Sequence, residues 1–126
     1  MREFIRIGVD LAKNYFQVHA LESEDGQATI RKLSRQAMRK FFAETRPCLV
    51  GMEACGSAHY WARELIAMGH DVRLIPPIYV KPYVKRGKND TADAAAVCEA
   101  LRVLPRVAPD EVRKGGFRLY SLERDT

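Results

Sequence analysis

The order of strand-like and helix-like segments constrains the fold of this chain most strongly. Three apolar or alternating runs come first, at residues 4–10, 15–21 and 27–33, and the cluster Ser23-Glu24-Asp25-Gly26 separates the second from the third. An Asp-Gly turn between two strand-like runs indicates an antiparallel hairpin. Helical and strand-like periodicities then alternate along the chain. This order predicts a mixed α/β sheet with helices on both faces.

The alternating part divides into clear segments. Ser34 is a suitable N-cap for an amphipathic helix that ends near Arg46-Pro47. A buried strand over 48–53, a helix over 57–68 and a strand over 71–75 follow, with Gly69 after the second helix. The segment 78–88 reads as a basic loop, and the alanine-rich stretch 90–102 as a helix. The predicted succession is therefore βββαβαβα.

Length and composition favour one soluble domain. The chain has 126 residues, enough for a single core, and we expect the domain to cover 1–103. Residues 104–126 contain Pro105, Pro109 and Gly115-Gly116 and no clear apolar face, which predicts an irregular tail. No apolar stretch approaches the roughly 20 residues of a membrane span. The three cysteines form no CxxC pair. A cytoplasmic protein with reduced thiols and no membrane partner is expected.

Four carboxylates occupy strand ends and a helix start. Asp10 follows the apolar run 5–9, Glu53 follows 48–52, and Asp90 and Asp93 open the last helix. If the first and fourth strands are parallel neighbours, their ends lie about 5 Å apart. A cluster of acids there would repel unless a divalent cation, Mg²⁺ or Mn²⁺, lay between them. Taken singly, Asp90 is an ordinary N-cap, Asp93 a first-turn acid, and the two strand-end acids can be simply solvated.

Two glycines repeat the same spacing. Gly8 precedes Asp10 by two residues, and Gly51 precedes Glu53 by two. The period of a strand puts each glycine on the same face as its acid. Such positions indicate close approach of a helix or a substrate.

The segment between Asp71 and Asp90 contains no acidic residue. Its basic and aromatic side chains favour contacts with nucleic-acid phosphates and bases, although a solvated loop with core tyrosines explains them equally well. The predicted nucleic-acid-binding residues are Lys81, Tyr83, Lys85, Arg86 and Lys88.

Three blocks of sequence resemble one family. The blocks are Ile7-Gly8-Val9-Asp10-Leu11-Ala12-Lys13, Met52-Glu53-Ala54-Cys55-Gly56-Ser57, and the run from Val80 to Ala94 that contains Lys88-Asn89-Asp90-Thr91-Ala92-Asp93. In this order they resemble the DEDD transposases of the IS-one-ten insertion-sequence family, over about residues 4–102.

The resemblance implies a ribonuclease H-like fold, similar to RuvC Holliday-junction resolvases. It also implies that Asp10, Glu53, Asp90 and Asp93 are both catalytic and metal-binding, with Mg²⁺ or Mn²⁺ as cofactor. DNA at the element ends and target, a guide (bridge) RNA and a homo-oligomer at full length are the implied partners. The implied activity is divalent-metal-dependent DNA cleavage and strand transfer in transposition.

The family continues into a second domain whose serine attacks DNA, and the tail after about Val103 does not match that continuation. We therefore expect a truncated transposase that cannot complete recombination alone. A nonenzymatic nucleic-acid-binding remnant is the main alternative. An actin-like or sugar-kinase-like ATPase is disfavoured, because no glycine-rich turn follows Asp10.

Overall fold

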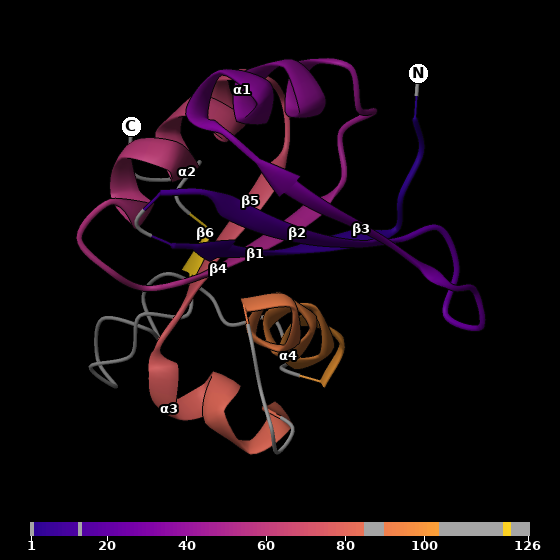
Figure 1. Ribbon diagram of the computed structural model, residues 1–126, viewed down its shortest axis with the longest axis vertical. Helices are drawn as coiled ribbons and strands as arrows, with labels where there is room; N and C mark the ends of the chain where they lie inside the picture. The colour runs from indigo at the N-terminus through magenta and orange to yellow at the C-terminus, as the bar shows by residue number, and fades with distance from the viewer. Residues whose placement is uncertain (1, 13, 85–89, 104–119, 122–126) are drawn as a thin grey trace.

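A six-stranded sheet organises the molecule, in the order β3-β2-β1-β4-β5-β6 (Figure 1). The computed structural model describes residues 2–12, 14–84, 90–103 and 120–121. Strand β1 pairs antiparallel with β2 and parallel with β4, while β5 is parallel to β4. The strands are β1 (Arg6–Leu11), β2 (Phe16–Leu21), β3 (Ala28–Leu33), β4 (Leu49–Glu53), β5 (Asp71–Ile75) and β6 (Tyr120–Ser121).

Helices cover both faces of this sheet (Figure 1). On one face lie α1 (Arg35–Ala43) and α2 (Ala58–Ala67), and on the other lie α3 (Pro77–Val80), the 3₁₀ turn η1 (Lys81–Tyr83) and α4 (Asp90–Val103). The antiparallel start, the parallel β1–β4–β5 group and the intervening helices form a ribonuclease H-like α/β fold. The predicted fold class is confirmed.

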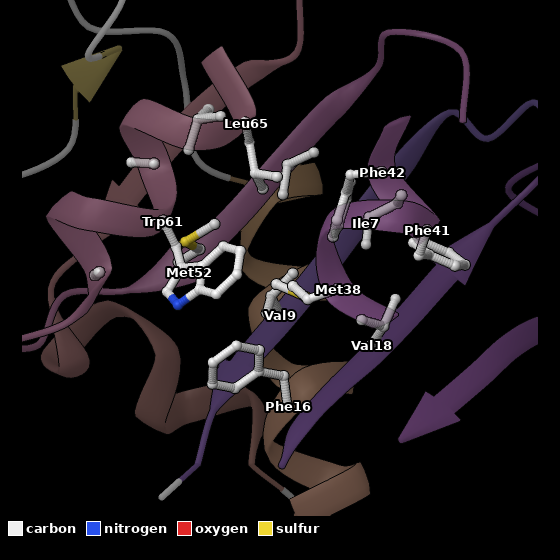
Figure 2. Close-up of a cluster of buried hydrophobic side chains, with 14 of the residues drawn as sticks. Ile7, Val9, Phe16, Val18, Met38, Phe41, Phe42, Met52, Trp61 and Leu65 are labelled. Atoms are coloured by element: carbon white, nitrogen blue, oxygen red, sulfur yellow. The ribbon is translucent and has the colours of Figure 1, made fainter. Parts of the chain in front are cut away.

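Side chains on the α1 and α2 face form the main core (Figure 2). Trp61 from α2 is fully buried, and its ring meets that of Phe16 edge to face with centroids 5.2 Å apart. Ile7 and Val9 of β1 point into the same cluster, beside Met38 of α1. A second, smaller cluster lies under α3 and α4. Within the described residues, no helix has the length and apolar character needed to cross a membrane.

The predicted helix boundaries have identifiable local causes. The hydroxyl of Ser34 accepts a hydrogen bond from the Ala37 amide at 3.2 Å, which confirms the N-cap of α1. Gly69 follows α2 with a φ of +97°, a left-handed conformation that favours glycine. Ser57 precedes α2, a position where serine often caps a helix, but its side chain makes no capping hydrogen bond.

Two segments differ from the prediction. Residues 77–83 form the turns of α3 and η1 where a basic loop was expected. Pro77 occupies the first turn of α3, where the fixed φ of proline suits a helix start, so the Pro-Pro pair ends β5 and also begins a helix. The tail, predicted as irregular, contributes β6, in which Tyr120 pairs antiparallel with Leu74.

Candidate metal and nucleic-acid site

The parallel pairing of β1 with β4 brings two acids to one edge of the sheet. Gly8 lies opposite Gly51, and Val9 lies opposite Met52. Asp10 and Glu53 are the next residues along the two strands, and both are half-buried. Adjacent parallel strands lie about 4.8 Å apart. The expected neighbourhood of Asp10 and Glu53 therefore follows directly from the register.

Both acids belong to the sheet face that α4 covers. Ile7 and Val9 point into the core with α1 and α2, so Gly8 and Asp10 face the other way. A Cβ on Gly8 would lie 2.3 Å from the carbonyl oxygen of Ala94. A Cβ on Gly51 would lie 2.7 Å from the Leu101 side chain. Close approach of a helix, one of the two predicted explanations, accounts for both glycines.

The contacts of α4 also fix its direction. The buried Arg6 donates from Nε to the carbonyl oxygen of Cys98 at 2.9 Å, whereas Gly8, two residues further along β1, approaches Ala94. Helix α4 therefore runs opposite to β1, and its first turn points toward the end of β1 that carries Asp10. Asp93 is half-buried in that turn. Asp90 begins α4, but its side chain lies outside the described residues.

Arg6, which contacts α4 through Cys98, also forms an ion pair with Glu24. The guanidinium of Arg6 donates to both carboxylate oxygens of Glu24, at 2.7 and 2.9 Å. These hydrogen bonds lower the pKa of Glu24 and raise that of Arg6. Burial raises the pKa of the neighbouring Cys98 thiol to about 11. Arg6 thus ties β1 to α4 and to the β2–β3 connection.

Carboxylate oxygens at this edge are the ligands that Mg²⁺ and Mn²⁺ prefer. The donor chemistry of Asp10 and Glu53 therefore fits such an ion. In the part of the chain that the structure describes, no three His, Cys, Asp or Glu side chains form a metal-binding group. The four-acid site stays a prediction, with Asp10 and Glu53 as its structurally adjacent pair.

The basic segment is described only in part. Lys81 is exposed in η1, while Tyr83 is half-buried and packs, with Tyr79, against the cluster under α4. Tyr83 therefore packs against the core, as the alternative to base stacking expected, and its contact with nucleic acid stays a prediction. Lys85, Arg86 and Lys88 lie outside the described residues.

Sequence reasoning overlooked two residues beside Asp10. Asp10 lies opposite Gln17, and Gln17 lies opposite Lys32, so the three form a row across the sheet. The Lys32 ammonium nitrogen stands 4.7 Å from the centroid of the Tyr15 ring. The hairpin turn at 23–26 was the signal that could have revealed this row, because it sets the β2–β3 register.

The fold and this edge define a ribonuclease H-like domain with acids at the ends of its two central parallel strands. A "Probable family 20 transposase" from Pseudomonas aeruginosa is 59% identical to the chain over 95 residues, 75% of this chain and 28% of that protein. A "Putative transposase y4pF/y4sB" from Sinorhizobium fredii is 50% identical over 80% of this chain and 26% of its own length. The "Transposase for insertion sequence element IS1328" from Yersinia enterocolitica is 45% identical over 75% of this chain and 28% of its own length.

Over the matched residues the chain is thus similar to proteins named as transposases, in agreement with the resemblance seen in its motifs. It spans 26–28% of the length of these relatives. The solved structure of T. thermophilus RuvC in complex with a Holliday junction substrate is also similar, with a TM-score of 0.49 and 12% identity over 93% of this chain and 98% of that one. No family model matches the chain.

Proposed function

We propose that this domain binds divalent metal and DNA and contributes to metal-dependent DNA strand cleavage and transfer in transposition. The observation that carries the proposal is the parallel register of β1 and β4, in which Asp10 and Glu53 follow the paired residues Val9 and Met52. Asp90 and Asp93 complete the proposed set, because α4 runs toward the same edge.

The electrostatics of the edge support a cation there. Two half-buried carboxylates lie on adjacent strand ends, and a divalent ion bound between them would stabilise both charged forms. A bound Mg²⁺ or Mn²⁺ would supply Lewis-acid stabilisation of the charge that develops on a phosphodiester during cleavage. The residues of the chain hold and orient that ion: β1 and β4 fix two carboxylates, and the Arg6 contacts fix the helix that carries the others.

DNA is the proposed nucleic acid because relatives at 45–59% identity are named transposases. Lys81, with the basic residues that follow it, would contact phosphates. By the family resemblance, a guide RNA and a second copy of the protein take part in the complete reaction. The same resemblance assigns the covalent attack on DNA to a serine of a second domain. Residues 1–103 would then contribute metal and DNA binding.

Two assays test this proposal: binding of DNA and nicking of supercoiled plasmid. Each is run with Mn²⁺ and with EDTA, on the parent chain and on the Asp10→Asn variant. DNA binding that strengthens with Mn²⁺, or nicking that requires it, supports the proposal if Asp10→Asn abolishes the metal effect. Salt-dependent binding that neither EDTA nor Asp10→Asn alters would instead support the nonenzymatic alternative.

A further inference from the structure

We infer that Tyr15 and Lys32 form a ledge that holds single-stranded DNA beside the acid edge, on its β3 side. The inference rests on the proposed function, since the ledge would bind a continuation of the strand held at Asp10 and Glu53. It adds a specific subsite that none of the transposase-like sequence blocks contains. We call this pair the Tyr15–Lys32 ledge.

The register places the ledge next to Asp10. Gln17 is the direct cross-strand neighbour of both Asp10 and Lys32, so all three lie in one row perpendicular to the strands. Two strand spacings separate Asp10 from Lys32, about 10 Å. Roughly three stacked nucleotides span that distance. A DNA strand that crosses the sheet edge would therefore reach Tyr15 and Lys32 within a few nucleotides of the acids.

The chemistry of the ledge matches a polynucleotide. The Tyr15 side chain is 49% exposed, and the ammonium group of Lys32 lies 4.7 Å from its ring centroid. Aromatic rings stack on bases, and adjacent cations contact phosphates. A single strand offers free base faces for stacking, whereas a duplex keeps its base faces within the stack. The exposed ring therefore favours single-stranded DNA.

The charges near the ledge are free to meet a ligand. Among the described residues, neither Lys32 nor the exposed Arg35 forms an ion pair with a carboxylate, although many arginines elsewhere do. Arg35 begins α1, and its guanidinium carbon lies 5.8 Å from the centroid of the core residue Phe16, so Arg35 lies on the sheet face opposite to Lys32. The ammonium group of Lys32 therefore supplies a positive charge beside the acid edge that a phosphate backbone would meet.

Fluorescence anisotropy with labelled oligothymidine tests the ledge, using the 126-residue chain in EDTA so that metal binding plays no part. Tyr15→Ala should weaken binding about fivefold or more through lost stacking, while Tyr15→Phe should bind as the parent does. Lys32→Gln should reduce the slope of log affinity against log salt by about 0.7. Arg31→Gln is the matched control, because Arg31 adjoins Lys32 but faces α1, beside Leu33 and Lys40. That variant should leave the slope unchanged.

If Lys32→Gln and Arg31→Gln change the slope of log affinity against log salt equally, binding depends on the overall charge and not on a specific site. That result would overturn the ledge. Unchanged binding by Tyr15→Ala, or a Tyr15→Ala effect confined to oligouridine, would overturn it too. A parent chain that does not bind oligothymidine also rules the ledge out. The proposed function is judged separately by the Mn²⁺ dependence of the parent, so the two failures are distinguishable. Thermal unfolding of each variant confirms that the exposed substitutions leave the fold intact.

Discussion

Gly8 and Ala94 approach so closely that no side chain fits between them: a Cβ on Gly8 would lie 2.3 Å from the Ala94 carbonyl oxygen. This contact seats α4 on β1. It also fixes where the first turn of α4, which carries Asp93, lies relative to the sheet edge. The packing of one glycine and the geometry of the proposed metal site are therefore linked.

Gly8→Ala should lower the free energy of unfolding by about 1–3 kcal/mol, because the added methyl group meets rigid backbone atoms of α4. Chemical denaturation measures the change. Gly56→Ala is the matched control, since a Cβ at Gly56 meets nothing within 4 Å. If both substitutions have the same small effect, α4 does not pack on β1 as described.

Ser34→Ala should destabilise the protein by about 1 kcal/mol through loss of the bond from the Ala37 amide. Ser57 offers an internal comparison, because it precedes α2 but makes no capping bond. Ser57→Ala should therefore cost clearly less in the same denaturation experiment. A larger loss for Ser57→Ala would contradict the assigned caps.

The free energy of unfolding should fall as the pH is lowered and Glu24 takes up a proton. The Arg6 guanidinium lowers the pKa of Glu24 in the folded state, so folding favours the charged carboxylate. Its contribution is complete above the ordinary glutamate pKa and is lost as the pH falls through that value toward the lowered one. Glu24→Gln should flatten the acid limb of a plot of unfolding free energy against pH. Glu22→Gln makes the same charge change and should leave the limb steep; equal curves would argue against the Arg6–Glu24 pair.

Strands β1 to β5 and two helix boundaries were predictable because they depend on local signals. Alternation, an Asp-Gly turn, the Ser34 cap and Gly69 each act within a few residues. The helical turns after Pro76 were missed because proline both ends strands and starts helices. Strand β6 depends on pairing with distant β5, which no local pattern reports.

The candidate site was predictable only in outline. Acids at the ends of two apolar runs pointed to a common edge, and the parallel β1–β4 register places Asp10 and Glu53 there. The position of Lys32 was not inferred, because it depends on counting the register through two strand pairs. The proximity of α4 to Gly8 is a tertiary contact across about 86 residues of sequence, which a glycine alone cannot specify.

Calorimetric titration with Mn²⁺ tests the central claim most directly. The parent chain should bind the ion, and Asp10→Asn and Glu53→Gln should each weaken binding by at least about tenfold, because each removes a charged ligand from one shared site. Asp25→Asn, in the exposed β2–β3 turn, makes the same charge change and should bind Mn²⁺ as the parent does. Parent-like binding by Asp10→Asn and Glu53→Gln would contradict a shared metal site at the ends of β1 and β4.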